Sequence, residues 1–327
     1  MRILYIYRHP DMGFSIGKVF KPIEEEMKKY AEVDSVYLPV PNYKLIGLWK
    51  NIRTALTAVH EKAYDIVHIT GAEHYLIPFL TKENVVVTVH DLGFFTNTWP
   101  SIRALWKYCL WIKTLPYAKR ISFISSQFKS EAERFVKFSE GQSYVVHNPV
   151  GPEFVYSPKE INSDHPVILH IGTKTNKNLE RTITALKGKK CTLRIIGNLT
   201  DRQLTLLKET KVQYSVAYNL TDKQILQEYK DCDYVNFPSL YEGFGMPIIE
   251  GQAVGRPVLT SNILPMKEIA GDGAVIVTPT NIDSIVAGYT MMGMMKDEIV
   301  RKGLCNVKRF YLDNIVKQYM EVYNSFT

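Results

Sequence analysis

Residues 233–250 read DYVNFPSLYEGFGMPIIE, and the interpretation of the whole chain starts from this stretch. Its first five residues are mainly apolar and predict a buried strand. Gly243 and Gly245 then allow a tight turn and a close approach of the backbone to a ligand. Pro247 suits the first turn of a helix, where its missing N–H removes no hydrogen bond. The pattern therefore predicts a strand, a glycine turn and a helix N-terminus in direct succession.

Two carboxylates flank this turn, because Glu242 precedes the glycines and Glu250 lies inside the predicted helix. Free backbone N–H groups and the positive end of the helix dipole bind anions at such a turn. A phosphate can therefore sit on the turn while one carboxylate binds sugar hydroxyls and the other binds ribose hydroxyls. The alternative is a tight strand-to-helix turn beside a solvated glutamate. The pair of spaced glutamates favours the ligand site.

Residues 242–250, EGFGMPIIE, and residues 253–258, AVGRPV, resemble the donor-site signature of the family-4 retaining glycosyltransferases. The similarity extends from about residue 167 to residue 287, and more thinly over the N-terminal half. The resemblance implies the GT-B fold, an α/β architecture of two Rossmann-like domains that face each other across a cleft. It also implies that a sugar moves, with retention at the anomeric carbon, from a nucleotide-diphosphate sugar to a glycan or lipid-linked acceptor.

A second glycine turn follows the apolar run 167–171, which predicts another strand. Lys174 and Lys177 lie between this turn and a predicted helix, and cations at a helix N-terminus favour a bound phosphate. The family pattern has arginine directly after the glycine, where this chain has Thr173, whereas Lys177 matches the family's lysine. Lys174 can supply the second cation with a different geometry, because an ammonium group is a point charge and a guanidinium group is a fork.

The resemblance assigns roles to these residues by their positions. Glu250 is expected to bind the ribose, Glu242 the transferred sugar and Lys177 the leaving diphosphate. The expected donor-binding residues are Gly172, Thr173, Lys174, Lys177, Gly197, Glu242, Gly243, Phe244, Gly245, Met246, Pro247 and Glu250. We identify no Asp-x-Asp metal site, and family members usually dispense with a divalent metal. The resemblance therefore implies neither a metal ion nor a cofactor.

The N-terminal half offers a glycine loop between residues 9 and 17, after a predicted first strand at 3–7. Ligands bind at such loops, because they lie at the carboxyl end of a strand in an open α/β sheet. Family-4 enzymes have a similar loop that faces the acceptor and the donor phosphates. The residues implied here are Gly13, Phe14, Ser15 and Gly17. The family's adjacent glycine pair is absent, so a plain connecting loop is the alternative.

His90 follows the apolar run 85–89, at the carboxyl end of a predicted strand. A side chain at that end of a parallel strand faces the edge where ligands bind. Family-4 sequences place a His-Asp pair after this strand, and the resemblance implies that His90 contacts the donor sugar near the reacting carbon. The predicted catalytic residues are thus His90, Glu242 and Lys177. A structural role for His90 is the alternative.

Residues 92–130 contain no Asp or Glu, and cations and tryptophans are interleaved along residues 99–120. Cations with long alkyl chains and aromatic rings at headgroup depth are typical of a segment on a membrane surface. We therefore expect residues 99–120 to contact an anionic membrane, and a helix packed on its own domain is the alternative. The four methionines between positions 291 and 295 are instead expected to fill the core.

The chain has 327 residues, 46% hydrophobic and 22% charged, with a formal charge of +7, which suits two ordinary folded domains. We expect residues 1–150 to bind the acceptor and residues 151–327 to bind the nucleotide sugar, with the last helix crossing back to the first domain. The four cysteines form no C-x-x-C pair and fit a reducing cytoplasm. No apolar stretch approaches the roughly 20 residues of a membrane span. We expect a cytoplasmic protein at the inner face of the cell membrane, with no nucleic-acid partner.

Two other classes of protein share features with this sequence. A sugar-nucleotide 2-epimerase has the same fold, but its catalysis needs carboxylates and histidines spread over both domains, a pattern that we do not find. A noncatalytic nucleotide-binding protein is the second alternative. Intact Glu242, Glu250, Lys177 and His90 argue against it. Glycosyl transfer is therefore the predicted function.

Overall fold

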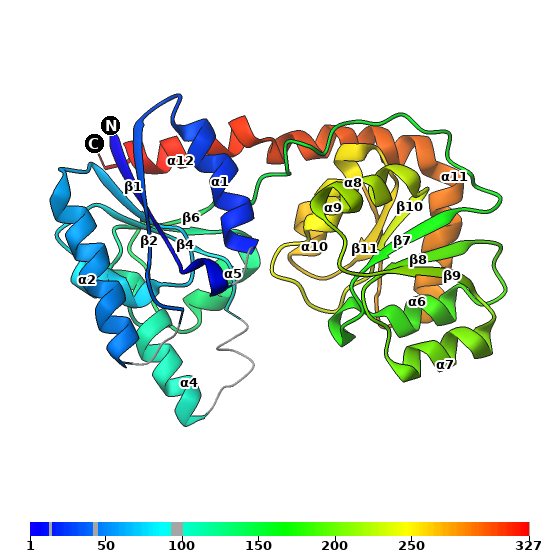
Figure 1. The fold of residues 1–327 in the computed structure, drawn as a ribbon. Coiled ribbons are helices and arrows are strands. Elements are labelled where there is room, and N and C mark those ends of the chain that lie inside the picture. The colour runs from blue at the N-terminus through cyan, green and yellow to red at the C-terminus, as the bar shows by residue number, and fades with distance from the viewer. Residues whose placement is uncertain (13–14, 42–44, 93–100, 327) are drawn as a thin grey trace. The chain divides into compact units, whose positions relative to one another are not determined.

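The computed structural model describes residues 1–12, 15–41, 45–92 and 101–326, with the backbone alone at residues 15, 102 and 103. The chain divides into two compact units (Figure 1). The N-terminal unit comprises Met1–Pro149 and the chain from Leu312 onward, and the C-terminal unit comprises Val150–Tyr311. Each unit holds a parallel sheet with helices, which confirms the predicted pair of Rossmann-like domains.

The sheet of the N-terminal unit has the strand order β2-β1-β3-β4-β5-β6. Its strands are β1 (Arg2–Tyr7), β2 (Glu32–Tyr37), β3 (Ile66–Ile69), β4 (Val85–Val89), β5 (Arg120–Phe123) and β6 (Ser143–Val145). Its α-helices are α1 (Ser15–Met27), α2 (Leu45–Glu61), α4 (Ile102–Lys107), α5 (Ser126–Glu133) and α12 (Leu312–Asn324). Shorter helical turns are η1 (Pro10–Met12), η2 (His74–Phe79), η3 (Tyr108–Ile112) and η4 (Leu115–Tyr117). Strands β3 and β4 are buried along their whole length, as continuous apolar runs predict for a parallel sheet.

The sheet of the C-terminal unit has the order β12-β11-β10-β7-β8-β9. Its strands are β7 (Val167–Ile171), β8 (Thr192–Ile196), β9 (Gln213–Ala217), β10 (Tyr234–Phe237), β11 (Val258–Ser261) and β12 (Val275–Val277). Its helices are η5 (Thr175–Lys177), α6 (Leu179–Ala185), α7 (Asp201–Thr210), α8 (Asp222–Asp231), α9 (Met246–Val254), α10 (Met266–Ala270), α11 (Ile282–Asn306) and η6 (Val307–Phe310). The chain order along the sheet reverses between β7 and β10, and ligands bind at such a switch point.

The last helix, α12, completes the core of the N-terminal unit. Its buried residues Ile315, Tyr319 and Val322 recur at helical spacing and pack against residues of β1 and α1. Buried His68 of β3 joins this helix to the sheet, because its Nδ1 lies 2.6 Å from the Tyr323 hydroxyl and its Nε2 lies 2.8 Å from Thr88 Oγ1. Burial lowers the pKa of His68 to about 3, so the ring is neutral at pH 7.

A second buried polar network lies in the core of the C-terminal unit. The Tyr289 hydroxyl of α11 donates to Asn236 Oδ1 at 2.7 Å. The Asn236 amide donates in turn to His170 Nδ1 at 2.8 Å and to Thr182 Oγ1 at 3.1 Å. Burial lowers the pKa of His170 to about 3. These bonds join β7 and β10, the two strands at the switch point, to the helices beside them.

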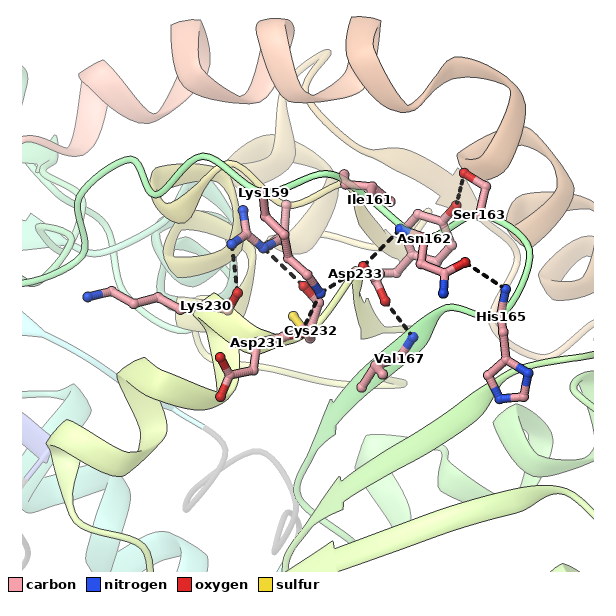
Figure 2. Close-up of polar contacts among 12 residues, drawn as sticks. Lys159, Ile161, Asn162, Ser163, His165, Val167, Lys230, Asp231, Cys232 and Asp233 are labelled. Carbon is pink, nitrogen blue, oxygen red and sulfur yellow. Dashed lines mark hydrogen bonds and ion pairs between the residues drawn. The ribbon is translucent and has the colours of Figure 1, made fainter.

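Within the C-terminal unit, the segment before β7 is bound to the start of β10 (Figure 2). The buried Asp233 carboxylate accepts hydrogen bonds from the backbone N–H groups of Asn162 and Val167 at 3.1 and 2.8 Å. It also forms a 2.8 Å ion pair with Lys159. Asp231 and Asp233 have the spacing of an Asp-x-Asp metal motif, but these contacts give Asp233 a structural role. Asp231 and Asp233 lie at the amino end of β10, whereas the glycine turn of the candidate site follows the carboxyl end of β10.

Arg256, from the AVGRPV motif, follows α9 and also binds the backbone next to Asp233. Its guanidinium is 2% exposed and donates only to backbone carbonyl groups at 2.8–3.2 Å. The acceptors are the carbonyls of Ser157, Lys230, Cys232, Val254 and Gly255. Arg256 thus satisfies buried carbonyls where several segments meet.

The expectation that the four methionines of α11 fill the core is wrong for three of them. Met292 is buried, whereas Met291, Met294 and Met295 are exposed. The physical reason is helical geometry, because neighbouring positions on a helix point to different sides. The helix also has non-helical backbone angles at Met295, which interrupt its regular pattern.

Candidate active site

The two predicted glycine turns lie side by side at the switch point of the C-terminal unit. Strands β7 and β10 pair in parallel, with Val235 opposite Leu169 and Asn236 opposite His170. The turn that begins at Gly172 follows the carboxyl end of β7, and the turn before α9 follows the carboxyl end of β10. Adjacent parallel strands bring both turns to one edge of the sheet. Residues about 70 positions apart in the chain therefore form one site.

Lys177 and Glu242 form the charged centre of this site. Lys177 Nζ donates to Glu242 Oε1 at 2.6 Å and lies 4.9 Å from the centre of the Phe237 ring. The side chains are only 22% and 13% exposed, so water screens the ion pair weakly. An ammonium group carries three N–H donors, so Lys177 can bind a phosphate while it holds Glu242.

Gly172 and Gly197 leave room for the side chains of the β7 turn. Gly172 has φ of +93°, and an added Cβ would meet Lys177 Cγ at 2.9 Å. Gly197 has φ of +138°, and a Cβ there would meet the Thr173 side chain at 3.0 Å. The Thr173 hydroxyl donates to the carbonyl of Asn198 at 2.6 Å, while Lys174 is exposed. Thr173 therefore fastens the turn, and Lys174 lies at its surface.

The turn before α9 has the predicted form. Gly245 is the N-cap with φ of +114°, Met246 and Pro247 open the helix, and no side chain caps it. Pro247 has no N–H and the Ile248 N–H donates to the Gly245 carbonyl at 2.9 Å, so the start of α9 offers an anion the Met246 N–H and the positive end of the helix dipole. Phe244, which we expected among the donor-binding residues, is 4% exposed and packs edge-on against Phe310 with ring centroids 5.9 Å apart. Its aromatic ring belongs to the core, so Phe244 can offer a ligand only its backbone.

Glu250 lies one helical turn inside α9 and is held by a neighbouring helix. The hydroxyl of Tyr229, in α8, donates to Glu250 Oε2 at 2.5 Å. Tyr229 is fully buried and packs edge-on against Phe154. Burial and the nearby Glu250 carboxylate raise the pKa of Tyr229 well above its usual range, so the phenol keeps its proton. The sequence interpretation did not identify Tyr229.

Two asparagines that flank Lys177 join the turns to each other. Asn176 Nδ2 donates to the carbonyl of Tyr241 at 3.0 Å and reaches Glu242 Oε1 at 3.4 Å. Asn178 adopts the left-handed conformation with φ of +62°, and its amide donates to the carbonyls of Pro238 and Pro279. The signal for these roles was present in the sequence, because asparagine tolerates this conformation and favours turns.

In the N-terminal unit, His90 follows β4 at the carboxyl edge of the sheet, as predicted. Its Nε2 lies 2.9 Å from the carbonyl of Thr70, so this nitrogen carries the proton and Nδ1 is left as an acceptor. Phe20 packs edge-on against the ring at 5.7 Å. Loss of solvation lowers the pKa of His90 to about 4, although the hydrogen bond to the Thr70 carbonyl acts in the opposite direction. His90 is therefore a neutral hydrogen-bonding group at pH 7.

The expected acceptor loop is only partly described. Gly13 and Phe14 lie outside the described residues. Ser15 and Gly17 do not lie in a loop, because α1 begins at Ser15 and includes Gly17. The prediction of a loop as far as Gly17 is therefore wrong, because the amphipathic pattern of the helix extends further towards the N-terminus than we expected.

The expected membrane segment, residues 99–120, is partly buried. Trp99 lies outside the described residues, and Trp111 is 5% exposed, with its indole N–H bonded to the carbonyl of Ala72. Arg120 donates to the side chain and the carbonyl of Ser325 and stacks on Phe326. These two residues hold the unit together, whereas Trp106 and other apolar side chains of the segment are exposed.

Two negative findings apply to the described parts of the chain alone. There, no group of three or more His, Cys, Asp or Glu side chains is arranged to hold a metal ion. None of the helices in those parts is both long and apolar enough to cross a membrane.

Two family models match adjacent parts of the chain. The model described as Glycosyltransferase Family 4 matches residues 19–154, and the model described as Glycosyl transferases group 1 matches residues 155–302. Together they cover residues 19–302, which include most of both units and each of the predicted catalytic residues.

Curated relatives are transferases of sugars. O-antigen chain mannosyltransferase B of Escherichia coli is 33% identical over 91 residues, which cover 27% of this chain and 24% of that protein. O-antigen chain mannosyltransferase RfbU of Salmonella typhimurium is 25% identical over 253 residues, which cover 74% of this chain and 69% of that protein. The match to the first relative thus spans about a quarter of that relative's length.

Solved structures with the same fold cover almost the whole chain. Sucrose-phosphate synthase from Thermosynechococcus elongatus has a TM-score of 0.81 at 16% identity, and covers 100% of this chain and 99% of its own. Anabaena Alr3699/HepE, solved in complex with UDP and glucose, has a TM-score of 0.73 at 14% identity, with coverage of 99% and 100%. At these identities the similarity establishes the fold alone.

Proposed function

The chain belongs to the family-4 glycosyltransferases of GT-B fold, and on this premise we propose that it transfers a hexose from a nucleoside-diphosphate sugar with retention at the anomeric carbon. One observation carries the proposal: two glycine turns meet at the switch point, with Lys177 paired to Glu242 and Glu250 one turn further along α9. The site offers a cation and a helix N-terminus to a diphosphate, and carboxylates to hydroxyl groups.

In the proposed reaction, the bond between the anomeric carbon and the diphosphate oxygen breaks. A new bond from that carbon to an acceptor oxygen forms on the same face of the sugar, and the acceptor's proton passes to the leaving diphosphate. Lys177, the Met246 N–H and the positive end of the α9 dipole stabilise the charge that develops on the diphosphate, since these groups are already oriented. Glu242 binds the transferred sugar, and Glu250 binds the ribose.

His90 has a narrower role in this proposal. Because its Nε2 proton is bonded to the carbonyl of Thr70, only Nδ1 can face a substrate, and there it accepts a hydrogen bond from a sugar hydroxyl. With a pKa of about 4, the ring does not act as a general acid at neutral pH. We further propose that the enzyme needs no metal ion or cofactor, because Lys177 supplies the positive charge at the leaving group.

The proposed acceptor is a glycan or a lipid-linked glycan of bacterial polysaccharide synthesis. The names of the two mannosyltransferase relatives support this class. We place the reaction in the cytoplasm at the inner face of the membrane, with the exposed part of residues 99–120 in contact with anionic lipid. Nucleic acid is not a proposed partner.

A thermal-shift panel of nucleoside diphosphates and nucleotide sugars tests the donor site. A ligand at 100 times its Kd adds about 2.7 kcal/mol to the free energy of unfolding, which the assay resolves. We expect one base and one sugar to give the largest shift, and a metal chelator to leave that shift and the turnover unchanged. If no member of the panel shifts the unfolding temperature, the donor-site assignment is wrong.

Product analysis separates the proposal from a 2-epimerase, which is the alternative of the same fold. The enzyme is incubated with the selected nucleotide sugar, with and without an acceptor glycan. A glycosyltransferase forms its product only with the acceptor, and the new linkage keeps the donor's anomeric configuration. An altered nucleotide sugar formed without acceptor contradicts the proposal in favour of the epimerase.

A further inference from the structure

Helix α2 presents large apolar side chains to solvent near its start. Leu45, Ile46 and Trp49 are 66%, 75% and 65% exposed. Phe79 of η2, 46% exposed, lies beside Trp49 with ring centroids 6.2 Å apart. Single exposed apolar residues are ordinary on protein surfaces, but four together form a patch, and such patches mark binding surfaces.

Cations share this face of the helix, whose sequence has no carboxylate before its last residue, Glu61. Residues 35–60 contain no Asp or Glu. Lys50 and Arg53 are exposed and follow Ile46 and Trp49 at helical spacing. A shallow hollow runs along the same face and is lined by Ile46, Trp49, Lys50, Arg53, His60 and, at its far end, Glu61, among others. The first acidic residue along this face is Glu61, at the end of the helix.

A second carboxylate-free region is connected to α2 through η2. Residues 92–130 lack Asp and Glu, and Leu105 and Trp106 of α4 are 54% and 51% exposed. The short helix η2 contacts α2, and it also contacts η3 and η4, which follow α4 in the chain. Because Trp111 and Arg120 are engaged inside the unit, residues 99–120 provide less exposed surface than their sequence suggests.

We infer that the exposed face of α2, residues 45–60 with Phe79, docks this protein on an anionic lipid surface. Exposed tryptophan and isoleucine suit the boundary between headgroups and acyl chains, and the alkyl chains of Lys50 and Arg53 allow their charges to reach lipid phosphates. Charge complementarity selects anionic lipid over neutral lipid, because residues 45–60 carry Lys50 and Arg53 without a carboxylate and Glu61 lies at the end of the helix away from the apolar patch. This inference extends the membrane contact of the proposed function to a second segment and does not depend on the donor site.

The experiment is co-sedimentation of the full chain with vesicles of phosphatidylcholine alone or mixed with phosphatidylglycerol, at low and high salt. We expect binding to the anionic vesicles at low salt and a marked loss at high salt. Each cation near an anionic leaflet contributes about five-fold in binding, so Lys50→Glu with Arg53→Glu should weaken it by roughly 25-fold or more. Trp49→Ser should weaken it by roughly 10-fold at either salt concentration.

Matched controls come from the C-terminal unit. Arg202→Glu with Lys208→Glu on α7 changes the net charge by the same amount at exposed positions, and Met294→Ser on α11 removes an exposed apolar side chain. Both control proteins should bind vesicles within about two-fold of the wild type. Thermal unfolding and nucleotide binding verify that every variant is folded, and nucleotide binding separates failure of this inference from failure of the donor site.

Three outcomes would overturn the inference. The first is wild-type protein that does not sediment with anionic vesicles at low salt. The second is equal loss of binding in the α2 and α7 charge variants, which would mean attraction by net charge alone. The third is full binding by Trp49→Ser and the α2 charge variant, in which case the face serves another partner, such as an acidic protein.

Discussion

The carboxyl edges of the two sheets differ in how their polar groups are prepared. In the C-terminal unit, the edge carries a paired ammonium and carboxylate, Lys177 and Glu242, and a second carboxylate that Tyr229 holds in place. In the N-terminal unit, the described edge carries the neutral ring of His90 between a carbonyl and an aromatic ring, and the cation Arg8, which follows β1, helps to lower the pKa of that ring. Fixed charges suit a diphosphate, whereas neutral hydrogen-bonding groups suit sugar hydroxyls. The comparison shows that two sheets of similar architecture carry different polar groups at their carboxyl edges.

The largest expected difference between the two units is the stability that each loses at acidic pH. Burial lowers the pKa of His68 to about 3 and those of His74 and His90 to about 4 in the N-terminal unit. In the C-terminal unit, His170 is lowered to about 3. An unfolded histidine has a pKa near 6.5, so the unfolded state binds more protons below that pH. The stability from these four neutral rings is therefore complete above pH 6.5 and is lost as the pH falls towards 4.

At pH 5.5 each buried ring should lower the free energy of unfolding by about 1.4 kcal/mol relative to neutral pH. Three rings give about 4 kcal/mol in the N-terminal unit, against about 1.4 kcal/mol for the one ring in the C-terminal unit. Hydrogen exchange of each unit at pH 7.5 and pH 5.5 measures the difference. Equal losses in the two units would contradict it.

Removal of the Lys177 ammonium group from the candidate donor site should have the next largest effect. Lys177→Ala should reduce turnover by roughly 10²-fold or more, because the developing charge on the diphosphate loses the ammonium group that stabilises it. Lys174→Ala should cost less, since that side chain is exposed. Steady-state kinetics with Lys208→Ala as the matched surface control provide the check. Unchanged turnover in Lys177→Ala would remove this lysine from the site, and a larger loss in Lys174→Ala would exchange the two roles.

Glu250 and Glu242 should differ in the quantity that their removal changes, which is nucleotide binding for Glu250 and turnover for Glu242. Glu250→Ala should raise the Kd of the nucleoside diphosphate by about 10-fold, the loss expected for a hydrogen bond to a charged group. Glu242→Ala should leave that Kd within about two-fold and mainly lower turnover, because it contacts the sugar. Calorimetric titration with the free nucleoside diphosphate and kinetics with the donor decide this. If Glu250→Ala binds the nucleotide as wild type does, the ribose assignment is wrong.

The smallest expected effect concerns the tyrosine that holds Glu250. Tyr229→Phe should raise the Kd of the nucleoside diphosphate by about five-fold, and should leave the weaker binding of a 2′,3′-dideoxy analogue unchanged. Tyr289→Phe is a suitable control, because it also removes a buried hydroxyl that donates a hydrogen bond, here to Asn236. That control should lower thermal stability and leave the Kd unchanged. Equal changes in Kd for both variants would mean a general structural effect.

The sequence was sufficient for features that depend on neighbours along the chain. The apolar run and glycines of residues 233–250 predicted β10 and the start of α9, and the structure confirms both. A capping box begins α8, because the Thr221 side chain accepts from the Gln224 N–H while the Gln224 side chain accepts from the Thr221 N–H, and the spacing of these two residues is the usual sequence pattern of such a box. The switch point, in contrast, depends on strand order, which periodicity alone does not determine.

Features that depend on distant residues were missed. Tyr229 lies 21 residues before Glu250 in another helix, so no local pattern connects them. The direction of the Phe244 ring depends on Phe310, and the burial of Trp111 depends on the carbonyl of Ala72. Composition indicates that a segment has cations and aromatics, but tertiary packing decides which of them reach solvent.

The place of α12 has a consequence for biosynthesis. Its buried residues Ile315, Tyr319 and Tyr323 belong to a core whose other members are mostly encoded within the first half of the chain. The ribosome therefore finishes residues 1–149 long before the segment that completes their core exists. At about 5–20 residues per second, the intervening C-terminal unit takes roughly ten to thirty seconds to translate. The unit that is synthesised first thus waits, with apolar surface uncovered, and is completed last.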